Sequence, residues 1–230
     1  MLPGRLWSNL YSLRERLLAP RLVAKVKREI PRQRAVSGSR RANVLVLEQA
    51  WKNHGAVGKF ESGFAAYYSY ILDQLKGVKV QNVLEIGVLG GGSHRVWRDI
   101  FPEATVYGFD IDPATVIREE RLRTFVGDQL SSSDLASLKS RLPEKFELIV
   151  DDGWHQPEAG VKSLVAFLPS LANGGYYVVE DIDLSKYRKI WFEVAQALPP
   201  CYITSLVELD TPASYNAIRG KYGLFIVTTT

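Results

Sequence analysis

The chain has 230 residues, of which 46% are hydrophobic and 23% are charged, a composition typical of a folded protein with one large core. It contains no apolar run near the roughly 18 residues of a membrane span, and its N-terminus lacks the pattern of a secretory signal. The single cysteine, Cys201, cannot form an internal disulfide, so we expect a cytoplasmic protein.

Positive charge is concentrated in residues 1–41. This segment has eleven Lys and Arg residues and two Glu residues, a balance of +9, whereas the whole chain carries +4. The remainder therefore carries −5, and the pI of about 9.1 gives no reason to expect a nucleic-acid partner.

The basic segment also has apolar residues at helical spacing on both sides of Pro20, which predicts two amphipathic helices. They would contact a membrane surface or an anionic polymer, or pack on the domain or on a second subunit of a homo-oligomer. The following stretch, "PRQRAVSGSRRAN" (31–43), has the composition of a linker. We therefore divide the chain into a basic helical arm with a linker, residues 1–60, and a second domain, residues 61–230.

From about residue 61, helices alternate with short apolar runs. A helix is predicted within "FESGFAAYYSYILDQLKG", and five strands follow: "NVLEIGV", "TVYGFDI", "RTFVG", "FELIVDD" and "GYYVVEDI". Four helical or partly helical connections separate them: "GSHRVWRDIF", "PATVIREE", "SSDLASLKSRL" and "QPEAGVKSLVAFLPSL". This alternation predicts an α/β fold with a parallel sheet covered on both faces. A helix near "SKYRKIWFEVAQAL" and two final strands, "CYITSLVELD" and "YGLFIVTTT", suit an antiparallel edge hairpin, which makes seven strands in total.

Ligands of open parallel sheets bind beyond the carboxyl ends of the strands. At the first end, "EIGVLGGGS", Glu85 closes the strand, and Gly87 begins a glycine-rich turn that leads to Ser93 and the next helix. Such a turn permits close backbone approach, and the N–H groups of the helix start can hold a carboxylate or a phosphate. The spacing departs from the G-x-G-x-x-G fingerprint, so a pyrophosphate-binding site is disfavoured.

The second and third strands end in further polar residues. Asp110 is positioned to accept both hydroxyls of a ribose, which together with the glycine turn indicates a cofactor that contains a nucleoside. Asp128 and Gln129 in "GDQ" have the groups to read an adenine edge, or they form a solvated turn.

Acidic residues also end the fourth and fifth strands, at "DDGWH" and "ED". We assign Asp151 to the cofactor site, and Asp152, Glu180 and Asp181 to a hard cation such as Mg²⁺, because so many carboxylates repel one another without one. His155 would be a general base beside the metal. Alternatively, one aspartate caps the following helix and His155 only packs.

The stretches "VLEIGVLGGGSHRVWRDIFPEATVYGFDIDP", "GDQ", "LIVDDGWH" and "GGYYVVEDID" resemble the class I S-adenosylmethionine-dependent O-methyltransferases of the macrocin and mycinamicin type, which methylate sugar hydroxyls with Mg²⁺. The resemblance covers roughly residues 80–185 and implies a Rossmann-like methyltransferase fold. It also implies S-adenosylmethionine and Mg²⁺ as cofactors and a sugar-containing acceptor. The implied roles are the methionine end of the cofactor at Glu85 and Gly87, its ribose at Asp110, the metal on Asp152, Glu180 and Asp181, and the base at His155.

The sequence departs from this family at Trp154, where the macrolide enzymes usually carry Ser, and it is shorter than those enzymes, which have a large N-terminal domain. A short form with a basic arm is more similar to actinobacterial enzymes that methylate mannose or rhamnose units of polysaccharides or glycolipids. Trp154 would stack on a sugar ring or pack. His54 and His94 have no comparable acidic partners in the sequence, and we expect both to be structural.

Four other functions remain open from the sequence. They are methylation of a catechol-like or other small hydroxylated metabolite, dinucleotide-dependent oxidoreduction, a hydroxylation related to that of cephalosporins, and a binding module without catalysis.

Overall fold

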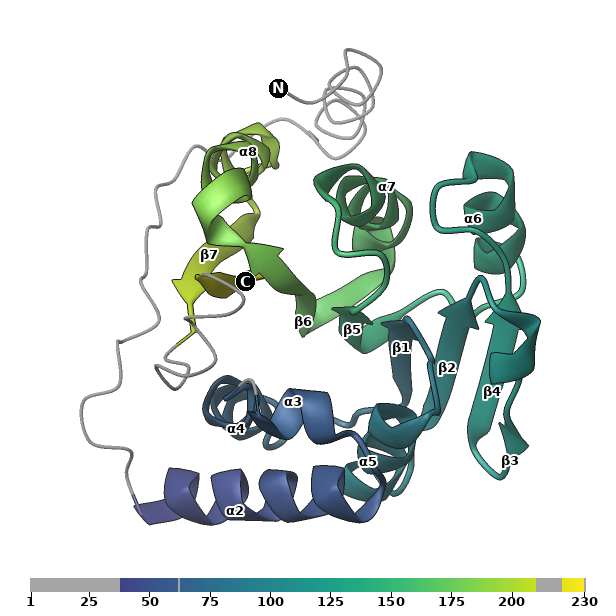
Figure 1. Ribbon diagram of the computed structural model, residues 1–230, viewed down its shortest axis with the longest axis vertical. Coiled ribbons are helices and arrows are strands. Elements are labelled where there is room, and N and C mark those ends of the chain that lie inside the picture. Colours follow the sequence, from purple (N-terminus) through teal and green to yellow (C-terminus); the bar gives the residue numbers. More distant parts are fainter. Residues whose placement is uncertain (1–37, 62, 210–220, 230) are drawn as a thin grey trace.

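A mixed sheet forms the centre of the molecule (Figure 1). In the computed structural model, which describes residues 38–61, 63–209 and 221–229, eight strands follow the order β3-β4-β2-β1-β5-β6-β8-β7. The strands are β1 (Asn82–Ile86), β2 (Thr105–Asp110), β3 (Arg118–Glu119), β4 (Leu122–Val126), β5 (Phe146–Asp151), β6 (Leu171–Asp183), β7 (Tyr202–Glu208) and β8 (Tyr222–Thr229). The five strands from β4 to β6 are parallel, whereas β8 is antiparallel to both β6 and β7.

The predicted fold, a mostly parallel sheet with an antiparallel C-terminal hairpin at its edge, is confirmed. The structure has an eighth strand because "PATVIREE", predicted to be partly helical, forms only the 3-10 turn η1 (Pro113–Thr115) before β3. The β-branched residues Val116 and Ile117 disfavour a helix here. The N–H of Ile117 donates to Thr124 Oγ1 at 2.7 Å, which holds this segment beside β4.

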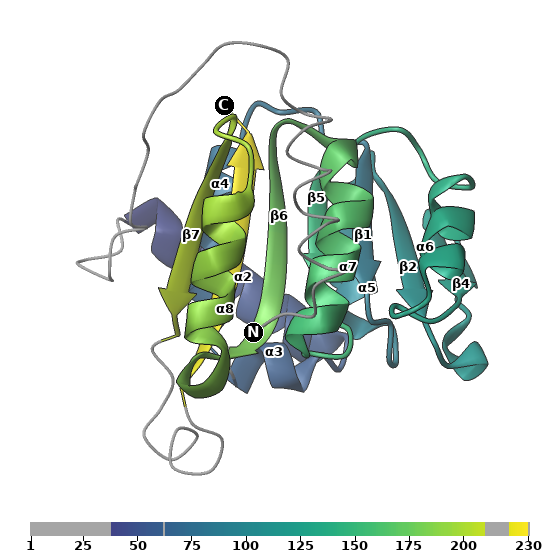
Figure 2. The ribbon, with the colours of Figure 1, turned by 90° about the horizontal axis from the view of Figure 1, so that it is seen from above.

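Helices cover both faces of the sheet (Figures 1 and 2). One face carries α6 (Ser132–Lys139), α7 (Pro157–Phe167) with the 3-10 turn η2 (Leu168–Ser170), and α8 (Leu184–Ala197); the other carries α2 (Gly38–Asn53), α3 (Val57–Glu61), α4 (Ala65–Gln74) and α5 (Gly92–Ile100). None of these described helices combines the length and the apolar character needed to cross a membrane.

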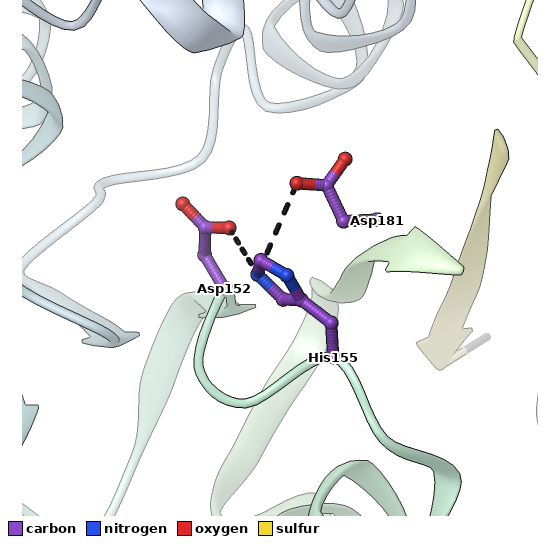
Figure 3. Close-up of side chains that lie close together, drawn as sticks. All are labelled: Asp152, His155 and Asp181. Atoms are coloured by element: carbon purple, nitrogen blue, oxygen red, sulfur yellow. Dashed lines mark hydrogen bonds and ion pairs between the residues drawn. The ribbon is translucent and has the colours of Figure 1, made fainter. Parts of the chain in front are cut away.

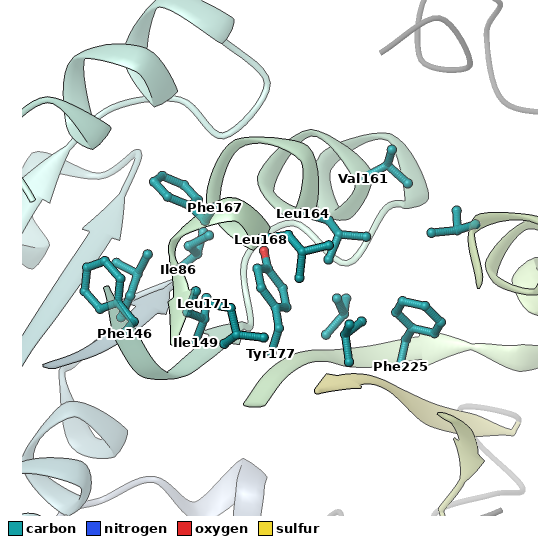
Figure 4. Close-up of a cluster of buried hydrophobic side chains, with 14 of the residues drawn as sticks. Ile86, Phe146, Ile149, Val161, Leu164, Phe167, Leu168, Leu171, Tyr177 and Phe225 are labelled. Carbon is teal, nitrogen blue, oxygen red and sulfur yellow. The ribbon is translucent and has the colours of Figure 1, made fainter. Parts of the chain in front are cut away.

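Each face of the sheet has its own hydrophobic core. Under α7, the side chains of Val161, Leu164 and Phe167 lie over sheet residues such as Ile149 and Tyr177 (Figure 4). On the opposite face, aromatic rings of α2, α4 and α5 pack edge to face or tilted, with centroids 5.0 to 6.3 Å apart: Trp51, Tyr68 and Trp97. These buried rings fix α4 and α5 against the strands whose ends form the site described below.

Helix α2 begins at Gly38, within the stretch 31–43 that the sequence indicated as a linker. Leu47 and Trp51, four residues apart on one helical face, are fully buried, and α2 packs against α4 and α5. The core therefore extends to the N-terminal side of residue 61. The two amphipathic helices predicted for the basic arm lie outside the described residues.

Candidate active site

Loops at the carboxyl ends of β1, β2, β4, β5 and β6 surround a cavity of about 910 Å³. Most of the residues predicted to form the site line it: Gly87, Ser93, Asp110, Asp128, Gln129, Asp152, His155, Glu180 and Asp181. Glu85 and Asp151 do not, because both are buried behind the cavity wall. The parallel strands thus bring together residues that are up to about a hundred positions apart in the sequence. This is the place, beyond the carboxyl ends of the strands, where open parallel sheets bind ligands.

The glycine turn after β1 is packed closely against the loop after β5. Gly87 has a φ of +93°, and a Cβ atom on it would lie 2.1 Å from the carbonyl oxygen of Asp152. Asp110 accepts hydrogen bonds on Oδ2 from the N–H groups of Val88 at 2.7 Å and Leu89 at 3.1 Å. Burial opposes its ionisation, but backbone N–H donors, that of Asp112 first and then those of Val88 and Leu89, hold the pKa of Asp110 below its ordinary value. Asp110 therefore organises the turn in addition to facing the cavity.

Gln129 and Asp151 hold the "DDGWH" loop from behind. Gln129 Nε2 donates to Asp151 Oδ1 and to Ser163 Oγ, both at 2.8 Å, and its Oε1 accepts from the N–H of Trp154 at 3.0 Å. Both amide hydrogens proposed to read an adenine edge are thus engaged within the protein. Burial raises the pKa of Asp151 to about 6. The structure gives both residues a role in positioning the loop, and Gln129 also lines the cavity.

Asp152, His155 and Asp181 converge at the open side of the site (Figure 3). His155 Nε2 lies 3.2 Å from Asp152 Oδ1 and 3.9 Å from Asp181 Oδ2, and one potential ligand atom of each residue lies within 4.8 Å of the others. His155 and Asp181 have φ angles of +54° and +50°, a region that residues other than glycine rarely adopt and that is enriched at functional sites. The pairing of β6 with β8 is also irregular between Val179 and Ile182, which redirects the side chains there.

The carboxylates around His155 determine its charge. Burial lowers its pKa, but the hydrogen bond that His155 donates to Asp152 and the charges of Asp152, Asp181 and Glu180 outweigh burial and raise the pKa to about 9. In this arrangement the imidazolium form is favoured at neutral pH.

A second group of charges, centred on Lys59, lies directly behind Asp152. Lys59 of α3 is only 7% exposed, and its Nζ lies 2.6 Å from Glu180 Oε2, 2.9 Å from Asp152 Oδ2 and 3.2 Å from Glu85 Oε1. Tyr68 of α4 donates a short hydrogen bond to Glu180 Oε1. Both oxygens of Glu180 therefore have partners within the protein. Lys59 and Tyr68 were not identified from the sequence, because neither lies in a motif or at a strand end.

These charges are strongly interdependent. Burial lowers the pKa of Lys59, but Asp152, Glu180 and Glu85 together raise it well above its ordinary value, so the group stays an ammonium. Burial raises the pKa of Glu180 to about 8, because the charge of Lys59, which lowers the pKa, does not offset burial and the neighbouring carboxylates Asp152 and Glu85.

Three known proteins are similar to this chain in sequence or in structure. Over 126 residues, 52% of this chain, it is 35% identical to a demethylmacrocin O-methyltransferase of Streptomyces fradiae. Over 142 residues, 59% of the chain, it is 32% identical to an 8-demethyl-8-alpha-L-rhamnosyl tetracenomycin-C 2'-O-methyltransferase of Streptomyces olivaceus. A solved structure of MycE, a methyltransferase of the mycinamycin pathway in complex with Mg and SAH, matches 80% of this chain and 54% of that chain with a TM-score of 0.61 and 26% identity.

Over about half of its length, the chain is similar in sequence to the macrocin and mycinamicin O-methyltransferases. The resemblance predicted from the sequence motifs is thereby confirmed. The matches cover 31% and 35% of the two curated enzymes, so the chain spans about a third of their length. No protein-family model matches the chain.

The side chains at this site fit a divalent cation in part. Asp152 and Asp181 are carboxylates, the ligands that Mg²⁺ prefers, and one oxygen of each lies within 4.8 Å of the other. Glu180, the third ligand predicted from the sequence, is instead turned toward Lys59 and Tyr68. The fit therefore rests on the two aspartates.

The two other histidines have acidic neighbours, contrary to the expectation from the sequence. His54 Nε2 lies 2.7 Å from Asp99 Oδ2, and the fully buried His94 has its Nδ1 3.2 Å from Glu85 Oε2. Burial lowers the pKa of His94, which favours a neutral ring. Neither belongs to the group formed by Asp152, His155 and Asp181.

Proposed function

We propose that this chain transfers a methyl group from S-adenosylmethionine to a hydroxyl group of a sugar. The observation that carries the proposal is the convergence of Asp152, His155 and Asp181 beside a cavity bounded by the glycine turn of Gly87. The named activities of the two curated relatives, both O-methyltransferases, support the same chemistry.

The donor would bind in the part of the cavity formed by the first three strand ends. Gly87 provides the close backbone approach, Ser93 lies in the first turn of α5, and Asp110 and Asp128 provide carboxylates for the nucleoside. MycE was solved with SAH, which supports S-adenosylmethionine as the donor rather than a dinucleotide. Residues Glu85, Gln129 and Asp151, also predicted to bind the cofactor, would act from behind by holding these loops in place.

The acceptor would bind beside His155. Asp152 and Asp181 would hold Mg²⁺, which when bound makes a neighbouring hydroxyl group more acidic. With the neighbouring carboxylates engaged by the cation, His155 would be neutral, and its Nε2 would take the proton from that hydroxyl as its oxygen forms a bond to the methyl carbon and the bond from this carbon to sulfur breaks. The acidic neighbours of His155 stabilise the imidazolium that results.

Trp154 gives the acceptor side a flat apolar surface. Its side chain borders the cavity next to His155 and is 59% exposed, unlike the buried indoles of the core. An exposed indole at this position suits stacking on the apolar face of a sugar ring. Mannose or rhamnose units are the proposed acceptors, and the rhamnosyl substrate in the name of one relative supports the latter. A catechol-like hydroxylated metabolite is the alternative acceptor.

The function is tested by donor binding and by methyl transfer. We expect SAH, but not NAD, to raise the melting temperature of the full chain, because only a ligand that binds the folded state stabilises it. Incubation with labelled S-adenosylmethionine and a panel of mannosides, rhamnosides and catechols should then label a sugar. Stabilisation by NAD alone would favour an oxidoreductase, and labelling of catechols alone would reassign the acceptor.

Removal of divalent cations is expected to abolish methyl transfer. Asp152 and Asp181 would then repel each other and the acceptor hydroxyl would lose its activation, so EDTA should stop the reaction and added Mg²⁺ should restore it. The measurement is label incorporation at fixed pH, with SAH affinity as a control that EDTA should leave unchanged. Full activity in EDTA would contradict the cation assignment.

A further inference from the structure

The position of Lys59 has a bearing on how the site holds a cation. This ammonium is almost completely buried, and it contacts Glu180 and Asp152 on the side of the cluster that faces α3. Its distances of 2.6 and 2.9 Å are those of charge-assisted hydrogen bonds. A cation already provided by the chain therefore neutralises carboxylates that would otherwise be available to a metal ion.

The two oxygens of Glu180 are used by different donors. Lys59 Nζ donates to Oε2 and the Tyr68 hydroxyl donates to Oε1, and the glutamate is fully buried. Coordination by Glu180 would place the ion on an oxygen that already accepts a hydrogen bond, in a fully buried position and beside the positive charge of Lys59. Asp152 also contacts Lys59, through Oδ2 at 2.9 Å, but unlike Glu180 it is partly exposed, and it lies together with the partly exposed Asp181 at the open side of the site.

We propose that Lys59 is a positioning residue that occupies the Glu180 side of the carboxylate cluster and restricts a divalent cation to Asp152 and Asp181. The inference rests on the proposed function, because it concerns the cation requirement of that same site. It also assigns Lys59 a role in setting how tightly the site binds a metal: its charge repels the ion, and its removal makes Glu180 available as a third ligand.

Direct measurement of Mn²⁺ binding to the full chain tests this assignment without reference to activity. Free Mn²⁺ is measured by electron paramagnetic resonance during titration of the wild type and of four variants: Asp181→Asn, Glu180→Gln, Lys59→Met and the double variant Lys59→Met with Glu180→Gln. Glu180→Gln and Asp181→Asn are matched changes, since each replaces one carboxylate by an amide of the same shape on neighbouring residues.

When Lys59 is intact, we expect Asp181→Asn to weaken Mn²⁺ binding about tenfold or more, and Glu180→Gln to change the affinity by less than about threefold. Lys59→Met should strengthen binding about tenfold or more, and the double variant should lose that gain, because Glu180 acts as a ligand only when Lys59 is absent. This dependence of one residue's effect on the other is not expected of a lysine that only stabilises the fold.

Two results would overturn the inference. One is that Glu180→Gln weakens wild-type Mn²⁺ binding as much as Asp181→Asn does, and the other is that Lys59→Met leaves the affinity unchanged or weaker. If the Lys59→Met variant does not fold, as judged by circular dichroism and thermal melting, the Mn²⁺ affinities of Glu180→Gln and Asp181→Asn are sufficient to test the inference. SAH binding and methyl transfer by the wild type test the proposed function separately, so its failure is distinguishable from failure of the role of Lys59.

Discussion

Replacing His155 with Ala is expected to lower the rate of methyl transfer by about 10²- to 10⁴-fold, the usual contribution of a general base. His155 is the imidazole of the site, with Nε2 3.2 Å from Asp152, and the substitution leaves no group there to receive the acceptor's proton. The donor contacts lie on other strand ends, so SAH affinity should stay within about threefold of the wild type. The measurements are kcat with labelled donor and SAH binding by calorimetry.

The matched control for this variant is His54→Ala. His54 also borders the cavity, but its ring pairs with Asp99 on the surface, away from Asp152 and Asp181. Loss of that ion pair should change kcat only slightly, since exposed pairs contribute at most about 1 kcal/mol. Turnover of the His155 variant equal to that of the wild type would remove this residue from the mechanism.

Replacement of Gly87 with Ala should both destabilise the protein and abolish donor binding. The added Cβ would lie 2.1 Å from the Asp152 carbonyl oxygen, and the φ of +93° is strained for any residue with a side chain. Steric overlap and backbone strain each cost roughly 1–3 kcal/mol, so we expect a loss of about 3 kcal/mol in the free energy of unfolding. Relief of the overlap would also displace the loop that carries Asp152.

Gly90→Ala is the control, because Gly90 belongs to the same turn and a Cβ there meets nothing within 4 Å. Urea denaturation and SAH titration of both variants provide the comparison. The Gly90 variant should be within about 0.5 kcal/mol of the wild type, as is usual for surface substitutions. Equal stability and SAH affinity in the two variants would show that the turn does not require glycine at position 87.

The strand ends that form the site were predictable because apolar runs separated by helices specify a parallel sheet, whose carboxyl ends meet at one edge. That reasoning brought Asp110, Asp152 and Asp181 together. It did not predict the direction of each side chain. Consecutive residues of a strand point to opposite faces, so Glu180 and Asp181 are not both expected to reach one ion. The irregular pairing of β6 and the positive φ of Asp181 also contribute to the different directions of the Glu180 and Asp181 side chains.

The residues that the sequence did not reveal come from helices. Lys59 and Tyr68 reach Glu180 from α3 and α4, more than a hundred positions earlier in the chain. Helical periodicity identifies the buried face of such a segment, but it does not specify which strand lies under that face or where along it the segment packs. A lysine in a short polar segment is usually solvated, and only the tertiary structure shows this one to be buried.

Lys59 connects α3 to the carboxylates of the sheet, and this limits how chimeras of this chain and its relatives can be built to change the proposed acceptor preference. A chimera that takes its strands from one protein and its preceding helices from another would separate a buried amine from the acids that require it. Glu85 and Glu180 would then face a dry interior without a counterion, a much greater cost than the loss of an exposed pair. Specificity is therefore better transferred by grafting the rim around Trp154, with the helices and the sheet kept from the same parent.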